Sequence, residues 1–100
     1  MYKYKETKNA LNDWKKLKSM SKPVKDKYKY LVIDILENPR NLDTVGNPEQ
    51  LKHKEVETWS RELTKKDRIV YGIEQGSNYG MPEEPEIVVF YQYLGHYKDK

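Results

Sequence analysis

The sequence predicts an α+β domain with the order β-α-α-β-β-β, in which a two-helix hairpin packs on one face of an antiparallel sheet. Apolar residues recur at a helical period before residue 39 and at a period of two after residue 55. The strand-like segments follow one another across polar turns, which favours antiparallel pairing. The chain has 100 residues, the length of one domain, and we expect residues 1–100 to form it.

The N-terminal elements are a short strand and a helix. Two tyrosines alternate with two lysines over residues 2–5, and this period of two predicts a strand. Thr7 is a suitable N-cap for a helix that we expect to continue to about Ser19. Its apolar stripe consists of Ala10, Leu11, Trp14 and Leu17.

A second helix follows after a tight link, so the two helices form a hairpin. Ser21 is a candidate N-cap, and Pro23 is tolerated in a first helical turn. Asn38 should end this helix, because the residue before Pro39 avoids the α region. The apolar positions of the helix are Val24, Tyr28, Leu31 and Ile35.

Three further strands are expected in the second half of the chain. Residues 39–55 are predicted to form a polar loop, and strands over 56–63 and 68–74 are joined by a polar turn. A longer loop over 77–85 precedes the strongest strand signal, over 86–93, which is rich in β-branched and aromatic residues. We therefore expect this last strand to be central and covered on both faces.

The composition excludes several classes of protein. No apolar run is long enough for a membrane span or a signal peptide, so we expect a cytoplasmic protein that does not bind membranes. The absence of cysteine excludes disulfide scaffolds and thiolate metal sites. With 36% hydrophobic and 35% charged residues, the chain is polar, but its apolar residues are clustered enough to form a core.

The positive charge is concentrated near the N-terminus. Residues 1–30 contain ten lysines and three acidic residues, whereas residues 31–100 contain nine basic and thirteen acidic residues. Clustered lysines attract phosphate backbones without reading their sequence. The alternative interpretation is that these lysines are the solvated faces of two helices.

Motifs for cofactor or metal chemistry are absent from the sequence. It has no phosphate-binding glycine loop, no His-x-x-x-His pair and no Gly-x-Ser-x-Gly elbow. Glu83, Glu84 and Glu86 lie between prolines, and we interpret them as solvated rather than as metal ligands. These observations favour a mechanism without metal or cofactor.

A sparse set of polar residues near the predicted strands remains as the candidate site. Such residues can converge because antiparallel strands are neighbours, although each also has a simpler explanation as surface or packing. Arg61 shares a face with Trp59 if its strand is regular, and it could instead pair with Glu62 or Asp67. The candidates are Glu49, Lys52, His53, Arg61, Arg68, His96 and Tyr97.

Four motifs contain these candidates. They are Gly-Asn-Pro-Glu-Gln-Leu-Lys-His at 46–53, Trp-Ser-Arg at 59–61, Arg-Ile-Val-Tyr at 68–71 and His-Tyr at 96–97. Their order and spacing closely resemble the YoeB/Txe branch of the RelE toxin superfamily, which consists of ribosome-dependent mRNA interferases of type II toxin–antitoxin systems. The predicted element order and the length also agree with that family.

The resemblance implies a metal-independent endoribonuclease that cleaves mRNA in the ribosomal A site and inhibits translation. In such a mechanism the ribose 2′-OH attacks the adjacent phosphate. Glu49 would be the base and His96 the acid, while Arg68 would stabilise the charge of the transition state and Tyr97 would orient the substrate. The RNA-binding residues implied by the family are Lys52, which shares the stabilising role, His53 and Arg61.

The resemblance also implies partners: an antitoxin protein, the 70S ribosome, an mRNA substrate, and in some cases a second copy of the chain. Glu62 stands where family members often have a second arginine. Residues 98–100 extend beyond the family's usual end, and the 76–85 loop is longer than usual. The alternatives are a non-catalytic, ParE-like gyrase inhibitor and an RNA-binding module on the same fold.

Overall fold

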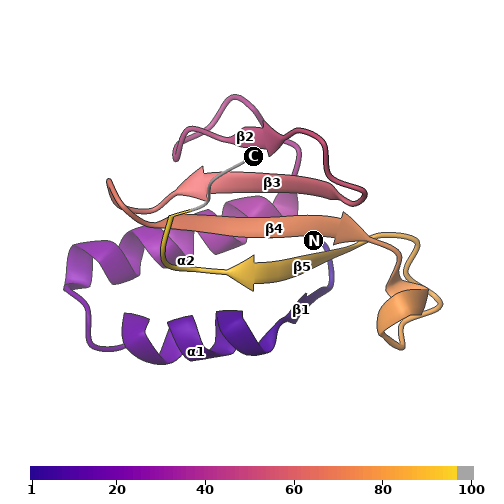
Figure 1. The fold of residues 1–100 in the computed structure, drawn as a ribbon, viewed down its shortest axis with the longest axis horizontal. Helices are drawn as coiled ribbons and strands as arrows, with labels where there is room; N and C mark the ends of the chain where they lie inside the picture. Colours follow the sequence, from indigo (N-terminus) through magenta and orange to yellow (C-terminus); the bar gives the residue numbers. More distant parts are fainter. Residues whose placement is uncertain (97–100) are drawn as a thin grey trace.

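A computed structural model describes residues 1–96 of the chain and contains a five-stranded sheet with the order β1-β5-β4-β3-β2 (Figure 1). The elements are β1 (Tyr4–Glu6), α1 (Lys8–Leu17), α2 (Lys22–Glu37), β2 (Glu49–Leu51), β3 (Glu57–Glu62), β4 (Arg68–Glu74), the 3₁₀ helix η1 (Gly76–Tyr79) and β5 (Ile87–Gln92). The predicted α+β class and helical hairpin are confirmed.

The structure corrects the predicted sheet in two respects. β1 pairs with β5 in parallel, so the sheet is mixed rather than wholly antiparallel. A short strand, β2, lies inside the predicted loop 39–55 and pairs with β3. The pattern of residues within a strand does not encode the direction of its partner, and β2 is too short to show a period.

The first helix is capped by Thr7 and held at its middle to the segment that follows β5. The Thr7 hydroxyl oxygen accepts a hydrogen bond from the Ala10 amide at 3.1 Å, as expected of an N-cap. The buried carboxylate of Asp13 accepts bonds from the amides of Tyr93 and Leu94, at 3.0 and 3.1 Å. These bonds hold the segment that follows β5 against α1.

The second helix ends where proline predicts. Ser21 is its N-cap residue, with Pro23 in the first turn, and Asn38 is its C-cap. The hydroxyl of Tyr71, from β4, donates to the Pro39 carbonyl at 2.7 Å, and burial raises the pKa of this phenol to about 12. None of the helices within residues 1–96 is long and apolar enough to cross a membrane.

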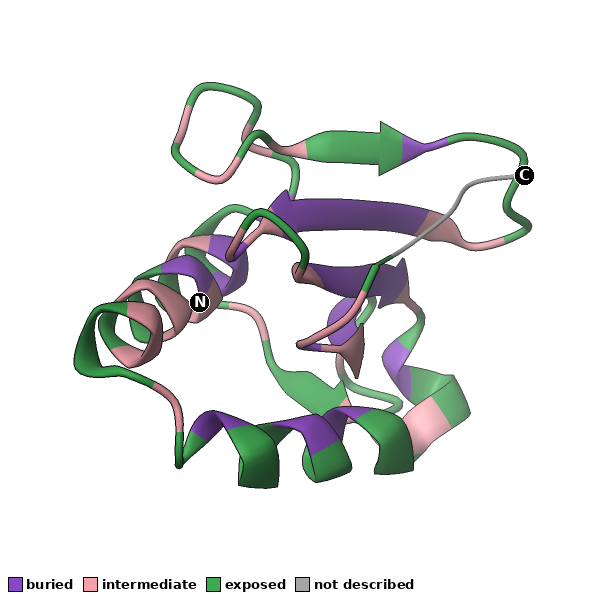
Figure 2. Cartoon of the chain, turned by 60° about the vertical axis from the view of Figure 1, so that its left-hand side comes forward, coloured by how far each residue is buried: buried purple, intermediate pink, exposed green. Residues whose placement is uncertain are grey.

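The two faces of the sheet have different environments. The helices cover one face, and Figure 2 shows the buried side of α1 turned toward the strands. Core residues on this face of the strands are Trp59, Ile69, Tyr71, Ile73, Val88 and Phe90. Because side chains alternate along a strand, Thr58, Ser60, Val70 and Gly72 lie on the other face. No helix within residues 1–96 covers this face, which is called the open face below.

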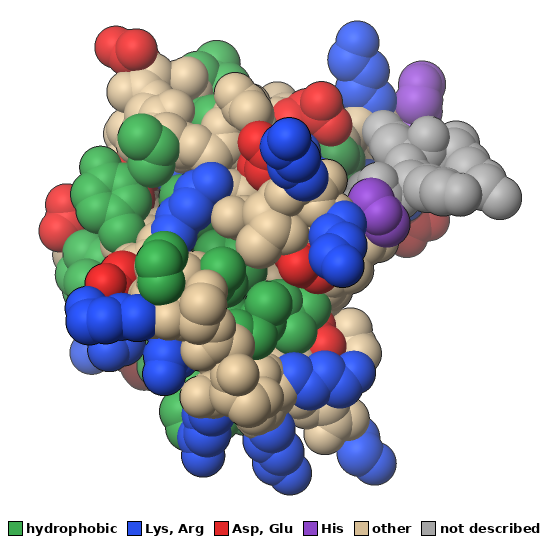
Figure 3. Space-filling view, turned by 90° about the vertical axis from the view of Figure 1, so that its left-hand side faces the viewer, with side chains coloured by type: hydrophobic (Ala, Val, Ile, Leu, Met, Phe, Trp, Pro, Cys, Tyr) green, Lys and Arg blue, Asp and Glu red, His purple; other side chains and the backbone are tan. Residues whose placement is uncertain are grey.

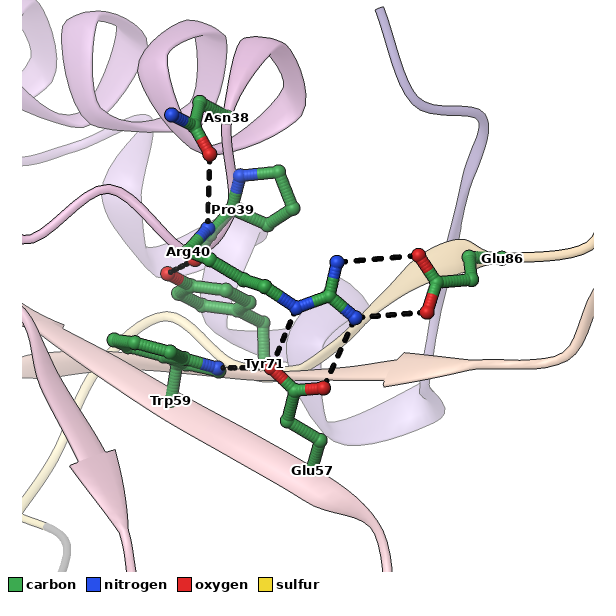
Figure 4. A network of polar contacts seen from close by, with 7 residues as sticks. All are labelled: Asn38, Pro39, Arg40, Glu57, Trp59, Tyr71 and Glu86. Carbon is green, nitrogen blue, oxygen red and sulfur yellow. Dashed lines mark hydrogen bonds and ion pairs between the residues drawn. The ribbon is translucent and has the colours of Figure 1, made fainter.

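The segment that leads from α2 to β2 is tied to the sheet by a charged network (Figure 4). Arg40 contacts Glu57 of β3 at 2.8 Å and Glu86 beside β5 at 2.7 Å, and the Trp59 indole donates to Glu57 at 2.9 Å. The hydrogen bonds from Arg40 lower the pKa of both carboxyl groups. Glu86 is therefore ion-paired, rather than simply solvated as expected.

Candidate active site

Three polar residues from three strands are neighbours on the open face. Glu49 of β2 lies opposite Ser60 of β3, and side chains of such cross-strand pairs share a face. Arg68, the first residue of β4, donates from Nε to the Ser60 hydroxyl oxygen at 3.0 Å. A carboxylate and a guanidinium thus lie on the two sides of Ser60, and Glu49 is exposed to solvent.

The orientation of the Arg68 guanidinium depends on Asn47. An Nη2 atom of Arg68 donates to the Asn47 carbonyl at 3.1 Å. Asn47 has a φ of 44°, in the left-handed region that asparagine tolerates better than most residues. Its side-chain amide donates to Glu62 at 2.9 Å. Glu62 therefore supports the turn that positions Arg68.

The structure brings His96 close to the beginning of β4 through its neighbour Gly95. The Gly95 carbonyl accepts from the Arg68 amide at 2.9 Å, and the Gly95 amide donates to Asp67 at 2.8 Å. Gln92 also donates to the Gly95 carbonyl, at 3.1 Å. The exposed His96 follows directly, whereas Tyr97 lies outside the described residues.

Lys52 and His53 lie in the loop that follows β2, and both are exposed. His53 has a φ of 62°, so the chain turns sharply at this position. Both residues line a hollow of about 360 Å³ beside β2. Figure 3 shows both histidine side chains of the chain on one side of the molecule.

The expectation that Arg61 contacts RNA is wrong for this structure. Arg61 does share a face with Trp59, as predicted, but that face is the one covered by the helices, and Arg61 is fully buried. Its guanidinium pairs with Asp34 of α2 at 2.7 Å, rather than with either neighbour considered from the sequence. Its Nε and the second Nη atom find no hydrogen-bond partner within residues 1–96.

The lysine-rich N-terminal third forms a basic surface on the helices. Figure 3 shows Lys and Arg side chains gathered on the side of the molecule that carries the turn between α1 and α2. Few interactions engage these lysines: Lys22 pairs with Asp26 at 2.8 Å, and the Lys18 ammonium lies 4.0 Å from the centre of the Trp14 ring. The cationic surface is therefore largely solvated and available to a polyanion.

Two signals for this site were not recognised in the sequence. Ser60 alternates with two buried residues of β3, so only the register with β2 shows that it lies beside Glu49. Asn47 follows Gly46, and that pair predicts a turn but not the carbonyl acceptor that holds Arg68. Across residues 1–96, no three His, Cys, Asp or Glu side chains are grouped so that they could hold a metal ion.

The fold is that of the small α+β toxins related to YoeB and RelE, as comparison with solved structures shows. A YoeB/ParE toxin from Agrobacterium tumefaciens superposes with a TM-score of 0.73 at 23% identity, covering 95% of this chain and 99% of that one. A YoeB dimer from Staphylococcus aureus gives 0.71 at 22% identity, covering 96% and 98%.

The sequence places the chain in one family within this class. The sequence model of one protein family, the YoeB-like toxins of bacterial type II toxin–antitoxin systems, matches residues 6–81, which include Glu49 and Arg68. The chain belongs to this family. In the YoeB–YefM heterotetramer from Staphylococcus aureus, the toxin matches with a TM-score of 0.70 at 22% identity, covering 97% of this chain and 99% of that one. No curated protein is significantly similar in sequence.

Proposed function

We propose that this YoeB-like toxin cleaves mRNA in the ribosomal A site and so inhibits translation. The observation that carries the proposal is the arrangement of Arg68, whose guanidinium is held 3.0 Å from the Ser60 hydroxyl on the strand directly opposite Glu49. A fixed cation beside an exposed carboxylate suits the transfer of a phosphoryl group between two oxygens of the same RNA strand.

Each step of the cleavage can be assigned to a side chain. Glu49 takes the proton of the ribose 2′-OH, and the oxygen attacks the adjacent phosphorus. The bond from phosphorus to the 5′-oxygen breaks, and His96 supplies the proton to that leaving oxygen. The products are a 2′,3′-cyclic phosphate and a 5′-OH end. Arg68 and Lys52 stabilise the negative charge that grows on the phosphate, and we assign substrate orientation to Tyr97.

The open position of the site supports a requirement for the ribosome. Glu49 of β2 and His96 beyond β5 are both exposed to solvent, so this chain does not enclose a flexible RNA strand by itself. A ribosome would hold the codon in place and supply the alignment of the 2′-OH with the phosphate. The lysines of α1 and α2 would contact ribosomal RNA in a salt-dependent manner.

We also propose an antitoxin partner, on the basis of the YoeB–YefM complexes from Staphylococcus aureus. The YoeB dimer from the same organism supports a homodimer as a further assembly. Both proposals can be tested by size-exclusion chromatography with light scattering, for the chain alone and co-expressed with the protein encoded beside it. We propose that the toxin acts in the cytoplasm, where ribosomes translate.

The decisive experiment maps the 5′ ends of an mRNA in a purified translation system. We expect cuts only on translated message, cuts that are lost with His96→Gln and retained with Glu83→Gln, which changes an exposed acid in a distant loop. Cleavage that survives His96→Gln would remove that residue from the chemistry. An intact message with the unmodified protein would refute the proposal and favour a gyrase inhibitor or a plain RNA-binding module.

A further inference from the structure

A second hollow, with a volume of about 510 Å³, lies on the open face next to the candidate active site. Thr58, Val70, Tyr91 and Gln92 line it from three strands, and segment 53–56 forms one wall. Val70 lies directly across from Ser60, so the hollow continues the row of cross-strand partners that contains Glu49 and Ser60, and Arg68 lies two residues before Val70 on the same face. Its volume falls within the range of about 300–1,000 Å³ that is typical of small-ligand sites.

Tyr91 and Gln92, consecutive residues of β5, both line this hollow because of a β-bulge. The pairing of β4 with β5 changes from Tyr71–Phe90 to Val70–Gln92, which leaves Tyr91 as the extra residue. Such bulges redirect a side chain and are common beside active sites. The main-chain carbonyl of Tyr91, freed from the ladder, accepts a hydrogen bond from the Thr7 hydroxyl at 3.0 Å. This hydrogen bond ties the bulge to the N-cap residue of α1.

Gly72 allows the Tyr91 ring to lie along the surface of the sheet. A Cβ atom at position 72 would lie 2.8 Å from two carbons of that ring, a distance that side chains do not tolerate. The ring therefore lies against the backbone of β4 at Gly72, and it also lines the hollow. The phenol donates to Glu74, which also accepts from the Tyr79 hydroxyl at 3.0 Å, so the far end of the ring is held in place.

The side-chain donors of the floor already have partners. The Thr58 hydroxyl donates to the Val56 carbonyl at 2.8 Å, and the Gln92 amide donates to the carbonyls of Arg68, Leu94 and Gly95. Burial and the Glu74 carboxylate raise the pKa of Tyr91, so its hydroxyl stays protonated and occupied. The floor consequently offers a fixed aromatic surface rather than a set of groups for hydrogen bonding.

We infer that this hollow is a subsite for one nucleobase of the RNA substrate, next to the scissile phosphate, and that Tyr91 is its stacking platform. The inference rests on the proposed function. Every base has a π-face, so stacking on a fixed ring holds a nucleotide whatever its identity. Gln92, which lines the hollow, donates to the main-chain carbonyl of Arg68 at 3.2 Å, and His53, one of the residues expected to bind RNA, lies in the wall.

The test uses ribosome complexes programmed with synthetic mRNAs that carry an abasic nucleotide at each position of the A-site codon in turn. For the unmodified toxin, we expect the KM of cleavage to rise about tenfold at one abasic position, the usual loss when a base no longer stacks on an aromatic ring. Tyr91→Leu should show the same rise on intact mRNA and no further rise at that abasic position, with kcat nearly unchanged.

Two variants separate stacking from a structural effect. Tyr91→Phe keeps the ring, so its KM should be close to that of the unmodified toxin rather than raised as in Tyr91→Leu. Tyr79 also bonds to Glu74 through its hydroxyl, but it does not line the hollow, so Tyr79→Phe should behave like the unmodified toxin. The inference is overturned if Tyr91→Leu leaves KM unchanged. It is also overturned if the rise in KM caused by Tyr91→Leu adds to the rise caused by an abasic nucleotide at every codon position.

If the unmodified toxin cleaves nothing, the proposed function is refuted but the subsite is not. A binding measurement then tests the subsite by itself. A short RNA with 2′-deoxy substitutions cannot be cleaved and can be titrated while the tyrosine ring protons are followed by NMR. We expect the Tyr91 signals to shift upfield as a base stacks on the ring. Unchanged Tyr91 signals at a saturating concentration of RNA would overturn the subsite.

Discussion

Replacing Asp34 with alanine should destabilise this protein far more than removal of an ordinary surface charge. Asp34 is the ion-pair partner of Arg61, whose side chain is fully buried, and the side chain of Asp34 is only 20% exposed. Its removal leaves a buried guanidinium without a counter-charge. Breaking such a pair usually costs about 3–5 kcal/mol, and the partial exposure of Asp34 favours the lower end of that range.

The expected shift is large for a chain of this size. A loss of ~3 kcal/mol should lower Tm by ~12 °C or more, since each kcal/mol corresponds to about 4–8 °C in a domain of 60–100 residues. Thermal unfolding followed by circular dichroism measures it directly. Asp26→Ala is the matched control, because Asp26 lies in the same helix and its ion pair with Lys22 is exposed. That variant should lose no more than about 1 kcal/mol.

The double variant Asp34→Ala/Arg61→Met completes the test. It removes both charges, so it should be more stable than Asp34→Ala alone. Together with the two single variants and the unmodified protein it completes the cycle that gives the coupling energy of the pair. Equal shifts of Tm for Asp34→Ala and Asp26→Ala would refute the argument. Arg61→Met alone should keep the cleavage rate of its folded fraction, because a buried arginine does not contact RNA.

Three further predictions concern the charged network, the proposed base and the helix cap. Because Arg40 lowers the pKa of Glu57 and Glu86, their contribution to stability is present above the unfolded value of 4.5 and is lost as the pH falls below it. Arg40→Gln should therefore flatten the loss of stability between pH 5 and pH 3, measured by urea unfolding, and an unchanged pH profile would contradict this reasoning. Glu49→Gln should lower single-turnover cleavage on ribosomes by roughly 10²–10⁴-fold while toxin still co-sediments with them, and loss of co-sedimentation would make this residue a docking group instead. Thr7→Ala should cost about 1 kcal/mol in urea unfolding through loss of the N-cap of α1, and no loss would show that the cap is replaced by solvent.

The helices could be predicted closely because their ends depend on local chemistry. Thr7 caps α1, and the proline after Asn38 ends α2, within a residue or two of the expected positions. The strands Arg68–Glu74 and Ile87–Gln92 were also recognisable from their period of two and their β-branched residues. By contrast, the parallel pairing of β1 with β5 depends on how the helical hairpin returns the chain, and no local pattern contains that information.

The site could be predicted only in part, because its residues are defined by the faces of a sheet. Arg61 and Arg68 are both cations on adjacent strands, yet one is buried under α2 and the other lies on the open face. Their order along the chain does not distinguish them, since a shift of one residue exchanges the two faces. Arg61 shares a face with the buried Trp59. Alternation would therefore have assigned Arg61 to the core if the face of Trp59 had been known to be the one that the helices cover.

The bulge at Tyr91 shows how one irregularity links the fold to the proposed site. Tyr91 alternates with the buried Phe90 and therefore lies on the open face, where its ring lies over Gly72. The extra residue brings Gln92 opposite Val70, so Gln92 shares that face. Gly72→Ala is therefore expected to disturb the ring without touching Glu49, Arg68 or His96. If the ring is a stacking platform, Gly72→Ala should raise KM for ribosome-bound mRNA as Tyr91→Leu does, and combining the two substitutions should add little. If the two substitutions raise KM additively, Gly72 is needed for the packing of the sheet rather than for the position of the ring.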